Sequence, residues 1–165
     1  MKILGIDPGY AIVGYGLIDY TRNQFTVLSY GSITTDKNDE FSHRLKVIYD
    51  DYSQILTTFK PDVISIEKLY FSKNVTTGID VAQARGLILL GAAQHNIPIY
   101  EYTPMQAKQA LVGYGGADKH QMQEMTRQIL HLKSVPKPDD TADALAMAIC
   151  HAHVSGSLMR FMPKR

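Results

Sequence analysis

The sequence is poor in cysteine, in long apolar runs and in net charge. Its single cysteine, Cys150, excludes an intramolecular disulfide bond. It contains neither an apolar run of membrane-spanning length nor a signal peptide, so we expect a cytoplasmic protein. We find no internal repeat and no low-complexity tract. The composition, 45% hydrophobic and 20% charged over 165 residues, predicts one globular domain over residues 1–165, with a flexible tail over about 155–165.

The charge balance at first argues against a nucleic-acid binder, because the formal net charge is only +1. This sum misleads when acidic residues gather in one site. If four of the 16 acidic side chains bind metal ions, 12 remain against 17 Lys and Arg residues, and the rest of the protein carries +5. The small net charge is therefore compatible with binding of nucleic acid.

The spacing of apolar residues predicts an α/β protein. Three apolar segments near the start, joined by short turns, predict an antiparallel meander whose first strand, KILGID, ends at Asp7. Apolar positions at helical spacing predict an amphipathic helix from Phe41 to Phe59, and DVISIE predicts a buried strand that ends at Glu67. Beyond it we expect a helix from Thr76 to His95, a strand at IPIYEY, and two short helices that begin at the capping pairs Thr103–Gln106 and Asp118–Gln121.

The segment PDDTADALAMA, from Pro138 to Ala148, places three aspartates at the start of an apolar helix. Asp is favoured at helix starts because it accepts hydrogen bonds from free backbone N–H groups, and we assign Asp139 to this capping role. Asp140 and Asp143 are three residues apart and project side by side, so their charges repel. A divalent cation outside the helix would compensate them, although an acidic first turn is by itself a common structural feature.

Two further acids end buried strands. Asp7 and Glu67 each stand at the carboxyl end of an apolar strand, where the ligand sites of α/β sheets gather. A single acid in such a position is usually a solvated turn residue. Both acids, taken with Asp140 and Asp143, predict a convergent cluster of four carboxylates.

An all-oxygen cluster of this kind suits Mg²⁺ or Mn²⁺. The histidines and Cys150 have no zinc-binding spacing, and His151 and His153 are too close in register for a helical metal pair, so we expect both on the surface. Carboxylates that hold two metal ions about 4 Å apart are suited to the attack of water on a phosphodiester. The residues thus predict nuclease chemistry.

Five motifs along almost the full chain, GIDPG, IEKLYFSKN, QARG, KQALVG and DTADALA, together resemble the RuvC-type Holliday-junction resolvases of bacteria. The resemblance implies a ribonuclease H-like α/β fold with a mixed five-stranded sheet flanked by helices. It implies an endonuclease that resolves four-way DNA junctions by paired symmetric nicking in homologous recombination and DNA repair, leaving 5′-phosphate and 3′-hydroxyl ends. It further implies a homodimer, two Mg²⁺ ions per active site with Mn²⁺ as a substitute, and a branch-migration motor complex of the RuvA–RuvB type as partner.

Matched motif by motif, the catalytic and metal-binding acids of the family correspond to Asp7, Glu67, Asp140 and Asp143. The aromatic residue that follows the strand-end Glu corresponds to Tyr70, where the family usually has Phe, and Phe71 lies beside it. Such rings suit stacking on an unpaired base, whereas aromatic residues of loops more often pack onto the core. The expected DNA contacts are Tyr70, Phe71, Lys73, Arg85, Lys108 and Lys119.

Small residues are frequent in the long predicted helix: they are Ala82, Ala84, Gly86, Gly91, Ala92 and Ala93. They permit either close packing on the chain's own sheet or the approach of a helix from a partner subunit. Because a two-fold dimer presents two identical sites to a four-way junction, we take this helix as the candidate dimer contact.

Two other functions share parts of the pattern. A ribonuclease H or RNA-processing nuclease of the same fold would have the four acids but lack the aromatic segment. GIDPG also resembles the first phosphate loop of actin-like ATPases and sugar kinases, which need two lobes and a second phosphate motif, and this chain is too short for both. Incubation with Mg²⁺ and a four-way junction, an RNA–DNA hybrid or ATP separates the three.

Overall fold

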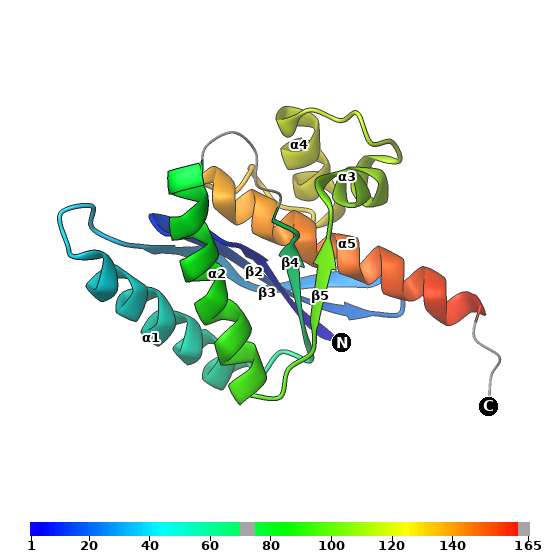
Figure 1. The fold of residues 1–165 in the computed structure, drawn as a ribbon. Coiled ribbons are helices and arrows are strands. Elements are labelled where there is room, and N and C mark those ends of the chain that lie inside the picture. Colours follow the sequence, from blue (N-terminus) through cyan, green and yellow to red (C-terminus); the bar gives the residue numbers. More distant parts are fainter. Residues whose placement is uncertain (70–74, 162–165) are drawn as a thin grey trace.

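A mixed five-stranded sheet with helices on both faces forms the body of the computed structural model (Figure 1). The structure describes residues 1–69 and 75–161, and for 75–77 and 157–161 it describes the backbone only. Across these residues, no helix has the length and apolar character needed to cross a membrane. The elements are β1 (Lys2–Asp7), β2 (Ile12–Thr21), β3 (Gln24–Thr34), α1 (Phe41–Phe59), β4 (Val63–Glu67), α2 (Val75–Gln94), β5 (Ile99–Tyr102), α3 (Pro104–Val112), α4 (Lys119–Ile129) and α5 (Asp139–Phe161).

The strands lie in the order β3-β2-β1-β4-β5. β1, β2 and β3 form the predicted antiparallel meander, whereas β4 runs parallel to β1 and β5 parallel to β4. Ile6 pairs with Ile66, so β1 and β4 end at the same edge of the sheet. The predicted fold class, an α/β fold with a mixed five-stranded sheet, is confirmed.

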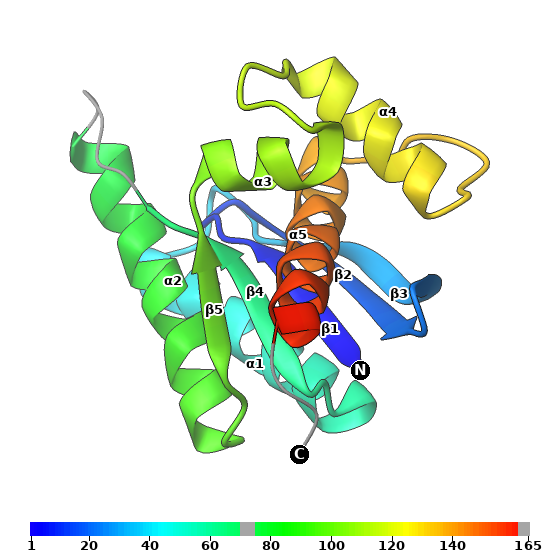
Figure 2. The ribbon, with the colours of Figure 1, turned by 90° about the vertical axis from the view of Figure 1, so that its right-hand side faces the viewer.

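The helices form two layers around the sheet. α1 and α2 cover one face, while α5 crosses the other face with α3 and α4 beside it (Figures 1 and 2). Successive strand residues point to opposite faces. Ile3 of β1 therefore packs with residues of α5, whereas Leu4 and Ile6 pack with residues of α1 and α2.

Local signals set the helix boundaries. α1 begins and ends as predicted, and Lys60 closes it in a left-handed conformation with a φ of 48°. The capping boxes Thr103–Gln106 and Asp118–Gln121 are present at the starts of α3 and α4, as predicted. α5 continues to Phe161, into the segment where we expected a flexible tail.

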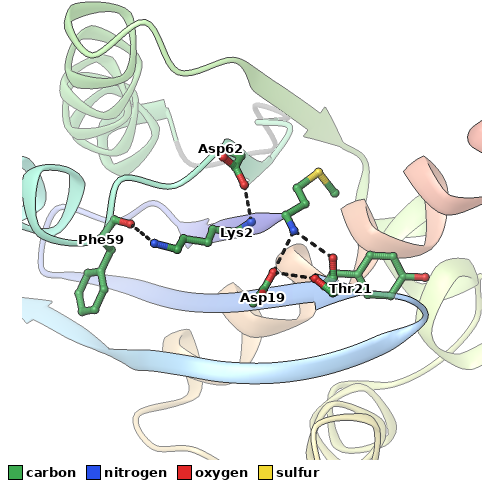
Figure 3. Close-up of polar contacts among 7 residues, drawn as sticks. Lys2, Asp19, Thr21, Phe59 and Asp62 are labelled. Atoms are coloured by element: carbon green, nitrogen blue, oxygen red, sulfur yellow. Dashed lines mark hydrogen bonds and ion pairs between the residues drawn. The ribbon is translucent and has the colours of Figure 1, made fainter.

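The amino end of β1 is held by short polar contacts (Figure 3). The Met1 ammonium donates to Asp19 Oδ1 over 2.9 Å, and the Lys2 backbone N–H donates to Asp62 Oδ2 over 2.7 Å. The hydrogen bond from the ammonium lowers the pKa of Asp19. These contacts anchor β1 to β2 and to the connection between α1 and β4. They therefore fix the position of β1, including that of its carboxyl end.

The small residues of α2 do not all share one face. Ala84 and Ala92 are buried in the core of the chain, and a Cβ on Gly91 would lie 2.7 Å from Tyr52 Cε1 of α1. The interpretation of these three residues as dimer contacts is wrong, because they permit α2 to pack on α1 and the sheet. In the described part of the chain, nothing lies within 4 Å of a Cβ built on Gly86, which faces outward.

The expectation that His151 and His153 lie on the surface is wrong. His151 is buried, with its Nδ1 2.7 Å from the Tyr102 hydroxyl, and burial lowers its pKa. His153 is half-buried, with its Nδ1 2.8 Å from the Ala110 carbonyl oxygen of α3. β5 and α3 cover this side of α5. The spacing of apolar residues within α5 does not reveal that other elements pack on this side, so the burial of the histidines could not be predicted from it.

Candidate active site

Asp7 and Glu67 end two adjacent parallel strands, so both carboxylates stand at one edge of the sheet. Burial raises the pKa of Asp7 to about 8, helped by repulsion from Asp143, Asp140 and Glu67, and the Lys119 ammonium opposes this rise only in part. All three other predicted acids therefore act on Asp7. The predicted acids thus lie near enough to Asp7 to affect its charge, and their role as metal ligands stays a prediction.

Two glycines of the sheet allow α5 to reach these strand ends. A Cβ on Gly5 would lie 1.9 Å from the carbonyl oxygen of Ala144, and a Cβ on Gly14 would lie 2.0 Å from that of Asp140. Any larger residue at either position would push α5 away from β1 and β2. These glycines therefore set the distance between the first turns of α5 and the end of β1.

The first turn of α5 holds aspartates in different surroundings. Asp139 is the first helical residue, and its carboxylate pairs with Lys137 at 2.7 Å and with Lys119 at 3.4 Å. The prediction that Asp139 caps the helix is wrong, because the preceding loop and α4 bring lysines to it. Hydrogen bonds from these lysines lower its pKa. Asp143 also pairs with Lys119, at 3.3 Å, whereas Asp140 acts on Asp7.

Glu67 and Asp143 face a common pocket. Burial, and next repulsion from Asp143, raises the pKa of Glu67 against the attraction of Lys108. Burial likewise raises the pKa of Asp143 against the attraction of Lys119. The pocket has a volume of about 200 Å³, and its lining comprises Glu67, Pro104, Ala107, Lys108, Lys119, Met122, Asp143, Ala146 and Met147.

The predicted DNA contacts are not all in one place. Lys108 and Lys119 line the pocket that also holds two of the acids. Arg85 lies on α2 with its guanidinium paired to Glu101 of β5, and its contact with DNA stays a prediction. Tyr70, Phe71 and Lys73 lie outside the described residues.

Sequence reasoning missed the apolar lining of the pocket. Met147 lies one helical turn beyond Asp143, and this spacing of four residues is the signal that could have found it. Pro104 has the same spacing to Lys108 on α3. Met122 carries no such signal, because its place in the pocket depends on how α4 packs beside α3 and α5.

The donor chemistry of the site fits a hard divalent cation. The four acids offer only carboxylate oxygens, and within the described residues no ion pair reaches Asp7, Glu67 or Asp140. Burial, and next repulsion from the other three carboxylates, raises the pKa of Asp7, and Lys119 does not offset the two together. No three acidic, histidine or cysteine side chains of the described residues already surround one point as metal ligands do.

Comparison with known sequences supports one family. The model of the family crossover junction endodeoxyribonuclease RuvC matches residues 3–151. The crossover junction endodeoxyribonuclease RuvC of Alkaliphilus oremlandii is 54% identical over 164 residues, which cover 99% of this chain and 100% of the relative. That of Brevibacillus brevis is 56% identical over 152 residues, which cover 92% of each chain.

Comparison with solved structures agrees. Thermus thermophilus RuvC in complex with Holliday junction substrate has a TM-score of 0.87 at 30% identity, covering 95% of this chain and 96% of that chain. The yeast mitochondrial Holliday junction resolvase has a TM-score of 0.70 at 12% identity, covering 96% of this chain and 82% of that chain, which shows a shared fold alone. The sequence relatives match nearly the whole chain at far higher identity. This chain therefore belongs to the RuvC family of crossover junction endodeoxyribonucleases.

Proposed function

We propose that this chain resolves Holliday junctions by paired symmetric incision in homologous recombination and DNA repair, leaving 5′-phosphate and 3′-hydroxyl ends. One observation carries the proposal: Asp7 and Glu67 end two adjacent parallel strands at one edge of the sheet, and Asp143 of α5 lines the same pocket as Glu67. Acids gathered from two strands and one helix are the equipment of a metal-dependent nuclease. The four-way junction as substrate is supported by membership of the RuvC family and by the relative from Thermus thermophilus, solved with a Holliday junction substrate.

RuvC-family nucleases are metal-dependent. We assign the metal ligands, which are also the catalytic acids, to Asp7, Glu67, Asp140 and Asp143, with two Mg²⁺ ions per site and Mn²⁺ as a substitute. When bound, such ions activate the attacking water and stabilise the leaving 3′ oxygen. As a metal ligand, Asp143 would exchange its ion pair with Lys119, which measures 3.3 Å, for contact with the ion.

Lys108 and Lys119 are the proposed contacts of the scissile phosphate. Both line the pocket that Glu67 and Asp143 share, so they place positive charge beside the carboxylates. Lys119 is the first residue of α4, where the helix dipole disfavours a cation. Ion pairs with Asp139 and Asp143 offset this cost in the structure, and a DNA phosphate is a further anionic partner for the same ammonium.

Paired incision requires two active sites, and we propose a homodimer that contacts through the outward face of α2. Ile79 and Leu90 are 50% and 49% exposed, which is unusual for large apolar side chains. Gly86 lies between them and leaves room for a helix of a second copy. We therefore propose this exposed face of α2 as the dimer contact, in place of the buried face that carries Ala84 and Gly91.

The remaining proposals come from the sequence, the first two from its composition and apolar pattern and the others from the family resemblance. They are a single nuclease domain over residues 1–165, a cytoplasmic location, and cooperation with a motor complex of the RuvA–RuvB type. They also include junction contacts by Tyr70, Phe71, Lys73 and Arg85.

The test replaces single acids by their amides. Asp7→Asn and Glu67→Gln should bind a four-way junction with unchanged affinity and fail to cut it in Mg²⁺, because they lose metal charge and leave the DNA-contacting surface intact. Asp51→Asn, an exposed acid of α1, should cut normally and serves as control. Full cutting by either amide variant, or wild-type preference for an RNA–DNA hybrid or ATP, would contradict the proposal.

A further inference from the structure

The turn between α3 and α4 folds back over the start of α3 (Figure 2). Gly113 ends α3 with a φ of 89°, a conformation that favours glycine. A Cβ built on Gly115 would lie 2.9 Å from Met105 Cγ, so the turn rests on the first turn of α3. Gly113 and Gly115 allow the chain to fold back in this way, and Tyr114 lies between them in the turn.

The folded-back turn exposes two large apolar side chains. Met105 is 64% exposed and Tyr114 is 47% exposed. The Tyr114 hydroxyl donates to Gln121 Oε1 over 2.8 Å, and the same oxygen accepts the Asp118 backbone N–H of the capping box. The ring of Tyr114 is therefore tied to the start of α4 and held in place while it remains open to solvent.

This surface adjoins the catalytic pocket at both of its ends. Met105 follows Pro104 in the chain, and Gln121 precedes Met122, and both Pro104 and Met122 line the pocket. The helices that the turn connects also carry Lys108 and Lys119 into that pocket. The first turns of α3 and α4, on which the turn rests and to which Tyr114 is tied, thus both contribute residues to the pocket lining.

We propose that Tyr114 and Met105 form a platform on which a nucleotide of the cut DNA strand stacks, next to the phosphate held by Lys108 and Lys119. The inference rests on the proposed function of the same site. An aromatic ring provides a flat face on which any base can stack, and the flexible thioether of Met can pack against the edge of that base. The platform holds the strand by its base or sugar, while the lysines hold it by its phosphate.

The experiment measures affinity for a fluorescent four-way junction by anisotropy in EDTA, where the strands stay intact. Tyr114→Ala should bind about tenfold more weakly, as expected for loss of one stacked base. Tyr114→Phe keeps the ring but loses the hydrogen bond to Gln121, so it should bind more tightly than Tyr114→Ala. Tyr30→Ala, an equally exposed tyrosine on β3, should also bind like the wild type. Circular dichroism confirms that each variant is folded, and Tyr114→Leu replaces Tyr114→Ala if that variant unfolds.

Salt dependence separates stacking from charge. Tyr114→Ala should lower the affinity at every salt concentration without changing the slope, whereas Lys108→Gln should reduce the slope by about one phosphate contact. Unchanged affinity of Tyr114→Ala overturns the platform, and so does a loss shared equally by Tyr114→Phe. In either case, a wild type that binds and cuts the junction keeps the proposed function intact. A wild type that does neither refutes the proposed function itself.

Discussion

Replacing Asp7 by Asn should make the metal-free protein more stable, although it removes a proposed metal ligand. The pKa of Asp7 is raised from 3.8 to about 8 by burial and by the carboxylates of Asp143, Asp140 and Glu67. At a pH between these two pKa values, Asp7 keeps its proton in the folded state but has lost it in the unfolded chain. The free energy of unfolding of the wild type therefore falls as pH rises through this window, and stays reduced above it.

The size of the change in stability follows from the difference between the pKa values of Asp7 in the unfolded and folded states. Each tenfold difference in proton affinity corresponds to about 1.4 kcal/mol, so the wild type loses on the order of 5 kcal/mol by roughly pH 8. This figure includes repulsion from the neighbouring carboxylates, which is one cause of the raised pKa of Asp7. Asn is neutral and nearly isosteric, so Asp7→Asn should gain about 5 kcal/mol at roughly pH 8 and about 2 kcal/mol at roughly pH 5.

Urea unfolding followed by circular dichroism, in EDTA and over this pH range, measures the gain. Asp51→Asn, which removes an exposed carboxylate from α1, should follow the wild type at every pH. Addition of Mg²⁺ should stabilise the wild type more than Asp7→Asn, because an ion that binds the folded state shifts the equilibrium toward it. Equal stability of Asp7→Asn and the wild type at roughly pH 8 in EDTA would contradict the raised pKa of Asp7, and with it the burial and carboxylate repulsion that cause it.

Three further changes test other parts of the structure. Asp139→Asn should retain junction cutting and Asp140→Asn should abolish it, and the reverse result would move the metal ligand to Asp139. Gly5→Ala should cost about 3 kcal/mol or more of stability in urea unfolding, because its Cβ would lie 1.9 Å from the Ala144 carbonyl oxygen, and wild-type stability would refute the close contact. Gly86→Arg should stay folded but become monomeric by light scattering and lose paired incision of a cruciform plasmid, whereas a dimer with normal paired incision would exclude this face of α2.

The elements of the fold could be predicted because their signals are local. The helix from Phe41 to Phe59 follows from the spacing of its apolar residues, and the capping boxes at Thr103 and Asp118 lie within one helical turn. Strand ends are local too, since GIDPG stops an apolar run at Asp7. The positions of the candidate acids could be predicted for the same reason, and the family motifs named them together.

The direction in which a helix faces was decided by packing alone. Small residues of α2 suggested a dimer contact, but Ala84 and Gly91 pack inside the chain while Gly86 faces outward. A stripe of small residues is equally compatible with both arrangements until the neighbouring helix is in place. His151 was misassigned for a related reason, because β5 and α3 cover a face of α5 that the sequence leaves open.

The charge state of the site also arises only in the folded chain. Asp7 is separated from Asp140 and Asp143 by more than a hundred residues in the sequence, and its raised pKa needs all three within one low-dielectric edge of the sheet. The lysines that pair with Asp139 come from the preceding loop and from α4, so its role could not be read from the helix start. Residue type and local spacing determined which side chains can serve as acids or cations in the site. Burial and long-range contacts decided which of these side chains carry uncompensated charge. The reason is that Coulomb energies depend on distances that only the tertiary fold sets.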